Sequence, residues 1–211
     1  ETPEQGLVYD AENLAFILPA GKYIGNSRYK DVFAASAMAD LTSFRNHWGA
    51  ETSLDVELYR PVARYELVAK DVATFLNKLS TGGLKGESFT ARVKYSDYLP
   101  TGYNLWDDVP KNSLMYMEYK VAFERPADGT KELILGFDYV LTDAGETVSI
   151  PVELEILNEK NEVLARTAFR IPCERGKNTT VRGNFLTSDA NGGIGIDPDY
   201  DGDLEVDLGE L

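Results

Sequence analysis

The chain has 211 residues, 43% hydrophobic and 11% aromatic, which is enough to bury a core in one large domain or two small ones. Its 35 acidic and 21 basic residues give a formal charge of −14. This charge argues against nucleic acid and anionic membrane surfaces as partners, because both attract clustered lysine and arginine. No run of about 20 apolar residues occurs, so we expect no membrane-spanning segment.

The two ends and the cysteine content bear on the cellular setting. The sequence starts at Glu1 without an initiator methionine or an apolar signal segment, so we expect its true beginning to lie upstream. Cys173 is the single cysteine, which rules out an intramolecular disulfide but leaves the compartment open. Residues 189–211 contain eight acidic and no basic residues. Because Leu204, Val206 and Leu208 alternate there, we interpret this stretch as a strand rather than an interaction tail.

Alternation of apolar and polar residues, typical of half-buried strands, runs through most of the chain. The tract 133–141 is instead almost continuously apolar, as expected for a central strand covered on both faces. The turn at 158–161 predicts a β-hairpin. The strands expected from these patterns cover residues 54–58, 89–95, 119–123, 133–141, 148–156 and 163–171.

Helical patterns are sparse. Asp71 is placed to cap a short helix that presents Val72, Phe75, Leu76 and Leu79 on one face and ends at Gly82-Gly83. The alanine-rich stretch within residues 29–46 suggests a second helix, although its apolar positions form no clean stripe.

Many short strands separated by Gly, Pro and Asn predict an all-β protein with minor helix, built as an antiparallel β-sandwich. Residues 101–113 contain turn formers and no strand alternation. We therefore predict a domain boundary there, between an N-terminal β-rich domain with one short helix (residues 1–110) and a C-terminal β-sandwich domain (residues 111–211).

No residue set predicts catalysis. His47 is the only histidine, so a Ser-His-Asp or Cys-His arrangement has a single available base and a zinc site lacks ligands. Cys173 follows Pro172 at a strand end, where a small buried apolar residue is the usual interpretation. Four charged residues lie near Cys173 in the sequence, and we interpret them as the charged rim of two strands rather than as a catalytic site. They are Arg170, Glu174, Arg175 and Lys177.

No nucleophile elbow, phosphate loop or dinucleotide fingerprint occurs, and nothing selects a carboxylate pair for glycoside hydrolysis. We expect no enzyme activity, no catalytic residue and no cofactor.

The single metal candidate is the turn Asp197-x-Asp199-x-Asp201-Gly202-Asp203, whose alternating carboxylates could converge on Ca²⁺. The twelfth position of an EF-hand loop carries a bidentate glutamate, but Leu208 stands there. We interpret the turn as a charged strand connector and expect no metal.

Two further patterns concern surface chemistry. Asn178-Thr-Thr180 fits the N-glycosylation pattern, which has meaning only in a eukaryotic secretory pathway. Aromatic residues gather between positions 95 and 120 and could line a carbohydrate-binding or partner-binding face, although aromatics on strands are more often core. They are Tyr98, Tyr103, Trp106, Tyr116 and Tyr119.

Four segments, taken together and in order, resemble a fimbrillin-related family of surface proteins of gut and oral Gram-negative anaerobes, in a branch described as a domain of unknown function. The segments are residues 59–71, 135–141, 171–187 and 197–203, and the similarity runs from about Leu54 to Leu208. The most particular of them, 171–187, belongs to a two-strand stretch that begins at Phe169.

The resemblance implies two transthyretin-like β-sandwich domains, export as a lipoprotein to the outer-membrane surface, and a role as a fimbrial (pilus) subunit or adhesin. Relatives that polymerise lose an N-terminal strand by proteolysis and accept a strand from the next subunit. Residues 8–46 are short for a complete sandwich, which leaves the N-terminal domain incomplete. The expected partners are other fimbrial subunits or host and glycan ligands. A carbohydrate-binding module for glycan capture is the alternative, and a hydrolase would need two acids in a deep cleft.

Overall fold

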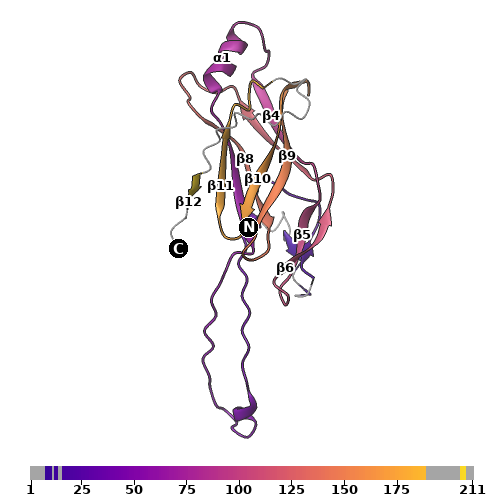
Figure 1. The fold of residues 1–211 in the computed structure, drawn as a ribbon, viewed down its shortest axis with the longest axis vertical. Coiled ribbons are helices and arrows are strands. Elements are labelled where there is room, and N and C mark those ends of the chain that lie inside the picture. The colour runs from indigo at the N-terminus through magenta and orange to yellow at the C-terminus, as the bar shows by residue number, and fades with distance from the viewer. Residues whose placement is uncertain (1–7, 11, 14–15, 189–204, 208–211) are drawn as a thin grey trace.

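The computed structural model describes residues 8–10, 12–13, 16–188 and 205–207. Two four-stranded sheets dominate it (Figure 1). The first has the order β10-β9-β4-β7 and is antiparallel throughout. Its strands are β4 (Ser88–Tyr95), β7 (Glu118–Glu124), β9 (Thr147–Asn158) and β10 (Val163–Glu174).

The second sheet has the order β12-β11-β3-β8. Strand β3 runs antiparallel to β8 but parallel to β11. Its strands are β3 (Val62–Ala69), β8 (Leu133–Leu141), β11 (Asn178–Gly183) and β12 (Glu205–Asp207).

Two small ladders, one helix and two short turns complete the β and helical content of the described residues. Two-stranded ladders join β1 (Tyr9–Asp10) to β2 (Leu18–Pro19) and β5 (Leu99–Asn104) to β6 (Val109–Leu114). The helix α1 (Val72–Ser80) follows β3, and two 3-10 turns, η2 (Arg28–Lys30) and η3 (Thr42–Phe44), lie nearer the N-terminus. No helix in the described ranges is long and apolar enough to cross a membrane.

One hydrophobic core joins the inner faces of both large sheets and the apolar face of α1. Tyr65 and Leu67 of β3 meet Leu154 and Ile156 of β9 in it, together with Phe75 of the helix. The alternating patterns supply these side chains, because every second residue of a strand points to the same face. The predicted all-β, antiparallel sandwich is therefore confirmed, with the parallel β3–β11 pair as an addition.

The predicted strands 89–95, 119–123, 133–141, 148–156 and 163–171 correspond to β4, β7, β8, β9 and β10. The central position predicted for 133–141 is wrong, because β8 lies at the edge of its sheet and leaves Ile134 exposed. The stretch around Val206 forms β12, as its alternation indicated. The helix over 72–79 is also confirmed, but Asp71 caps no helical N–H. Its carboxylate instead accepts the backbone N–H groups of Leu186 and Thr187, so it ties the helix start to the segment after β11.

Two expectations are corrected. Residues 29–46 contain only the short turns η2 and η3, because their small and apolar residues lack the helical stripe that packing needs. Residues 54–58 form no strand, for a reason given below.

Strands from both sides of the boundary predicted at residue 110 hydrogen-bond within each large sheet. Strand β4 pairs with β7 and β9, and β3 pairs with β8 and β11. The described strands thus build one sandwich in which the two halves of the sequence interleave.

Candidate functional site

One segment leaves the sandwich altogether. Residues 35–58, which we call the arm, project from it, and Figure 1 shows the two legs of the arm side by side below the sheets. Ala34 and Tyr59 close the base of the arm through two mutual backbone hydrogen bonds of 2.8 and 2.9 Å. The turn η3 lies toward its far end. The arm therefore presents both legs to its surroundings.

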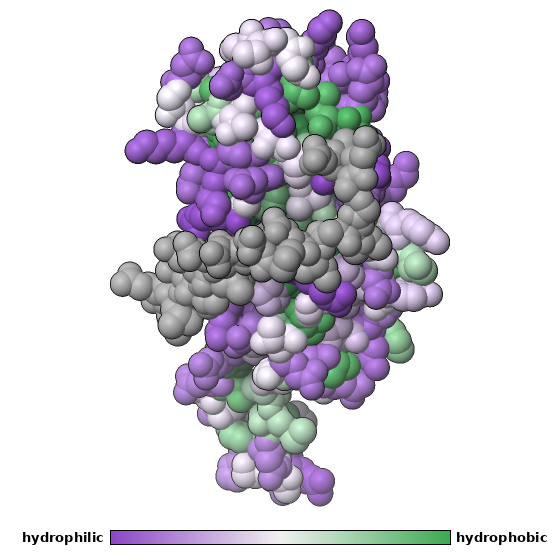
Figure 2. Space-filling model, turned by 45° about the horizontal axis from the view of Figure 1, so that its top comes forward, coloured by the Kyte–Doolittle hydropathy of each residue, from purple (hydrophilic) through white to green (hydrophobic). Residues whose placement is uncertain are grey.

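The arm carries apolar side chains that a folded protein usually buries. Met38 and Trp48 are 96% and 97% exposed. Leu41, Leu54, Val56 and Leu58 are exposed as well, and Figure 2 shows hydrophobic atoms on the lower projection of the molecule. Clustered exposed apolar residues of this kind mark surfaces that bind other molecules.

The second leg explains why the strand predicted over 54–58 is absent. Leu54, Val56 and Leu58 alternate with two acids, as in a half-buried strand. Residues 51–58 nevertheless make no backbone hydrogen bond in the part of the chain that the structure describes. This leg therefore has the alternating sequence pattern of a β-strand but pairs with no strand among the described residues.

A polar cluster at the base of the arm, which we call the clamp, holds Tyr59 in place. The hydroxyl groups of Tyr59 and Tyr103 each donate a hydrogen bond of 2.7 Å to Oδ1 of Asp108. Arg175, between β10 and β11, donates two more of 2.8 Å to the same carboxylate. Its guanidinium also lies 4.1 Å from the centre of the Tyr59 ring. The clamp thus joins the arm, the β5–β6 hairpin and the β10–β11 turn.

The clamp carboxylate is strongly stabilised as an anion. The hydrogen bonds from Arg175, with those from Tyr59 and Tyr103, lower the pKa of Asp108 to about 2 against burial, which raises it. Burial and the bond to Asp108 raise the pKa of Tyr59. The tyrosines therefore stay protonated donors and Asp108 stays an acceptor, an arrangement suited to holding geometry rather than moving protons.

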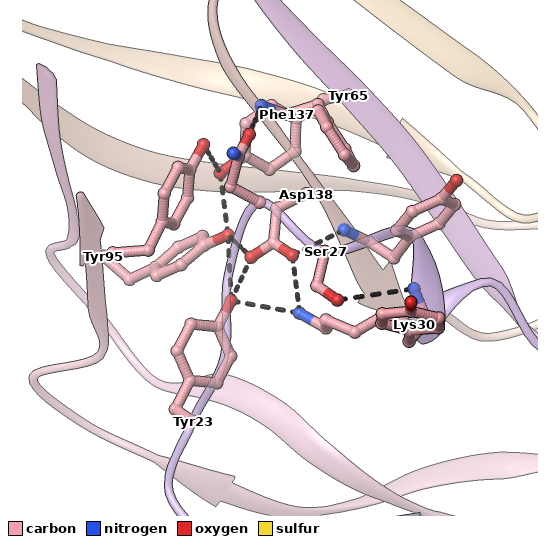
Figure 3. Close-up of polar contacts among 11 residues, drawn as sticks. Tyr23, Ser27, Lys30, Tyr65, Tyr95, Phe137 and Asp138 are labelled. Atoms are coloured by element: carbon pink, nitrogen blue, oxygen red, sulfur yellow. Dashed lines mark hydrogen bonds and ion pairs between the residues drawn. The ribbon is translucent and has the colours of Figure 1, made fainter. Parts of the chain in front are cut away.

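A second polar cluster, which we call the latch, lies inside the sandwich (Figure 3). Asp138 of β8 is fully buried and forms an ion pair of 2.7 Å with Lys30 of η2. Tyr95 donates a hydrogen bond of 2.7 Å to the other carboxylate oxygen, and Tyr23 donates to that oxygen too. The hydroxyl of Tyr65 lies 2.7 Å from that of Tyr95. The latch fastens the segment 23–30 onto β8.

Burial dominates the electrostatics of the latch. It raises the pKa values of Tyr23, Tyr65 and Tyr95 well above their ordinary value, and Asp138 adds to each shift. Burial also lowers the pKa of Lys30, which the attraction of Asp138 opposes. Each polar group is already committed to another, so the latch is structural. Beside it lies a cavity of about 260 Å³, lined by Tyr9, Pro19, Tyr23, Lys30, Thr101 and Tyr139.

The residues weighed for catalysis lie apart from one another. Cys173 is buried in the core, and burial raises the pKa of its thiol to about 12, which opposes thiolate chemistry. His47 lies exposed on the arm. Within the described residues, no group of three or more His, Cys, Asp and Glu side chains is placed to hold a metal ion.

The charged residues around Cys173 have separate partners. Arg175 belongs to the clamp, whereas Lys177 pairs with Glu174 at 2.5 Å. Arg170 donates to the hydroxyl and the carbonyl of Ser149 on β9. They contact strand and turn neighbours instead of converging on the thiol.

The aromatic group proposed for a binding face divides in two. Tyr103 and Tyr119 are buried, the first in the clamp and the second in the main core. Tyr98, Trp106 and Tyr116 are exposed by 60%, 74% and 85%. Only the exposed three are available to a ligand.

Two remaining motifs are placed as follows. The acidic turn 197–203 lies outside the described residues. Asn178 begins β11, and its side-chain oxygen accepts a hydrogen bond of 2.6 Å from Arg64.

Sequence reasoning missed Asp108, Tyr59, Asp138 and Lys30 as organising residues. One signal was available, since an Asp inside a nearly continuous apolar tract, as Asp138 is in 133–141, needs a buried partner. The sequence near Asp138 does not indicate that its partner is Lys30, which lies 108 positions away.

Comparison with known proteins places the sequence among relatives of unknown role. The model of a family described as a family of unknown function, DUF6562, matches residues 1–209. No curated protein matches the sequence.

Two solved structures are similar over part of the chain. One is a "putative cell adhesion protein" from Bacteroides ovatus ATCC 8483, with 13% identity, a TM-score of 0.34, and coverage of 60% of this chain and 41% of that one. The other is a "putative cell adhesion protein" from Bacteroides eggerthii DSM 20697, with 14% identity, a TM-score of 0.31, and coverage of 66% and 51%. The chain spans about half the length of these two proteins.

Proposed function

The chain belongs to the DUF6562 family of unknown function, and from this premise we propose that it is a non-enzymatic cell-surface protein that acts as a fimbrial component or adhesin. We further propose that it is exported as a lipoprotein to the outer-membrane surface. The resemblance of four ordered segments to fimbrillin-related proteins supports both proposals, as does the β-sandwich to which the first three of them contribute strands.

The observation that carries the proposal is the arm. Its apolar side chains, Trp48 and Met38 above all, remain in water in the isolated molecule. Burying one large apolar side chain contributes about 1.5–3 kcal/mol, so a partner surface that covers several of them gains substantial affinity. A projection with exposed apolar side chains suits a subunit that contacts its neighbour.

The second leg of the arm suits a protein partner. The backbone donors and acceptors of residues 51–58 have no partner among the described residues, and Leu54, Val56 and Leu58 place one apolar side chain at every second position. A segment of this kind can add as a strand to an exposed sheet edge, where backbone bonds give affinity and alternate side chains give specificity. Asp55 and Glu57 would stay on the solvent side.

The test replaces residues 36–57 with a short Gly-Ser turn, which the antiparallel bridge between Ala34 and Tyr59 can accommodate. We expect the shortened protein to fold, to reach the cell surface, and to lose incorporation into fibres or attachment to host cells. Immunogold microscopy and an adherence assay measure the two outcomes. The variant Trp48→Ala/Met38→Ala tests the apolar contacts without shortening the chain. Unchanged fibres and adherence in both variants would refute the role of the arm, and an intracellular location would refute the surface role.

Glycan capture is a second candidate, favoured by the exposure of Tyr98, Trp106 and Tyr116. Exposed aromatic rings offer flat apolar faces with a polar rim, which suits sugar rings. A glycan array probed with the intact protein tests it, and the absence of any bound glycan would eliminate it. Replacement of Tyr103 is uninformative here, because that side chain is buried in the clamp.

A further inference from the structure

Tyr116 stands out by its backbone. Five described residues other than glycine have positive φ, and four of them are Asn or Asp, which tolerate this conformation. The fifth is Tyr116, with φ 60°. A large side chain in the left-handed region costs about 1–2 kcal/mol. At 85% exposure its ring gains little from packing within the chain. Fold stability therefore does not explain a tyrosine here, and strain of this kind gathers at functional sites.

The surrounding structure holds Tyr116 in this position. The carbonyl of Met117 accepts a hydrogen bond of 2.9 Å from the backbone N–H of Tyr95, at the end of β4. The Met117 side chain packs against the main core. On the other side, Leu114 pairs with Leu99 in the β5–β6 ladder. The turn at Tyr116 is thus fixed at both ends, so its ring is presented from a rigid support.

A cavity of about 280 Å³ lies at this turn. Met115 and Tyr116 line one part of it, and Lys94, Ser96, Glu118 and Glu153 supply polar groups. The segments 95–99 and 114–117, which hold the two exposed tyrosines Tyr98 and Tyr116, run side by side here. The site combines an aromatic face, a hydroxyl, an amine and two carboxylates in one open hollow.

The charges of the hollow are already compensated. Lys94 lies 3.2 Å from Glu153 and 2.8 Å from Glu155. Glu118 lies 3.8 Å from Lys120. A charged ligand would have to displace these partners, whereas an uncharged one rich in hydroxyl groups can hydrogen-bond to them as they stand. The aromatic face then selects a ligand with an apolar ring surface.

We propose that the hollow at Tyr116 is a binding site for a neutral sugar ring, a hexose or N-acetylhexosamine residue of a larger glycan. The Tyr116 ring stacks on the sugar face, while Glu118, Glu153 and Lys94 hydrogen-bond to its hydroxyl groups. The proposal goes beyond contact through the arm, and it rests on the second candidate function, glycan capture, to which it assigns a site and a ligand class.

The experiment uses the intact protein on an array of neutral hexose and N-acetylhexosamine glycans, with sialylated and sulfated glycans included. The affinity for the best neutral glycan is then measured by titration calorimetry with three variants. Tyr116→Gly should weaken it by about tenfold or more and raise the melting temperature by about 1–3 °C, because glycine relieves the backbone strain. Tyr116→Asn, which tolerates the same backbone, should also weaken binding. Trp48→Ala, which removes an even more exposed aromatic side chain on the arm, should bind as the parent does.

Three results would overturn the assignment of the sugar site to Tyr116, and they differ in whether they also reject glycan capture. Absence of any bound glycan eliminates glycan capture together with the site. Binding that survives in both Tyr116 variants but is lost in Trp106→Ala keeps glycan capture and rejects this site. Preference for sialylated or sulfated glycans rejects the neutral ligand class. None of these results affects the role of the arm, which is tested separately by shortening it.

Discussion

The guanidinium of Arg175 lies over the ring of Tyr59, 4.1 Å from its centre, and both side chains bind the carboxylate of Asp108. These two residues are 116 positions apart, yet they meet at the base of the arm, where Tyr59 also pairs with Ala34. The cation–π contact and the charge-assisted hydrogen bonds reinforce each other, because the same position of the Arg175 guanidinium allows both.

We predict that Arg175→Met destabilises the protein by about 1–2 kcal/mol, since it removes two charge-assisted bonds from a partly exposed carboxylate. Urea denaturation measures the change in the free energy of unfolding. Arg170→Met is the matched control, because Arg170 is exposed and, among the described residues, its guanidinium hydrogen-bonds only to Ser149. Equal losses in the two variants would contradict a special role for the clamp.

The latch predicts a larger loss for Lys30→Met, about 3–5 kcal/mol, because it leaves the carboxylate of Asp138 buried without its cation. The double variant Lys30→Met/Asp138→Asn should recover part of that loss, since the buried charge is gone. Lys22→Met, on the exposed lysine just before this segment, should change stability little. The prediction fails if the double variant is less stable than Lys30→Met alone.

Gly25→Ala should also weaken the latch. A Cβ atom at Gly25 would overlap the side chain of Tyr119, so the segment 23–30 could not stay in place without moving that ring. We expect a lower melting temperature and faster proteolysis near the N-terminus. Gly21→Ala is the control, because its added methyl group meets nothing within 4 Å. Similar melting temperatures for the two variants would show that the segment packs otherwise.

Acid should destabilise the protein through Glu155 as well as Asp108. Burial alone raises the pKa of Glu155, but hydrogen bonds from Lys94, Arg92 and Arg166 outweigh it and lower the pKa to about 2. An unfolded glutamate titrates near 4.5. A carboxylate with a lowered folded pKa contributes stability that is complete above its unfolded pKa and is lost as pH falls toward its folded one.

The free energy of unfolding should therefore fall between about pH 4.5 and pH 2. Denaturation at a series of pH values measures the slope. Glu155→Gln should be less stable than the parent at pH 7, because three cations lose their shared partner, and its slope below pH 4.5 should be shallower. A parallel pair of curves would refute the assignment to Glu155.

Much of the fold could be predicted because its information is local. Alternation at 89–95 and 148–156 encodes a strand with one buried face, and Phe75 and Leu76 encode the inner face of α1. The excess of acids and the absence of a second histidine likewise limited the chemistry before any fold was known.

Only the tertiary structure decided which patterned segments find partners. Residues 54–58 alternate as the confirmed strands do, yet they stand unpaired on the arm, because pairing depends on which edge long-range packing leaves open. The ion pairs Asp138–Lys30 and Arg175–Asp108 likewise depend on long-range packing, because each joins residues far apart in the sequence. The sequence does not distinguish Tyr103 from Tyr116. In the structure Tyr103 is buried and donates a hydrogen bond to Asp108, whereas Tyr116 is exposed on a turn with positive φ. By itself the sequence determined the apolar periodicity of each strand and helix. Side chains that are distant in the sequence come into contact only when the two sheets pack on a common core, and these contacts form the candidate sites.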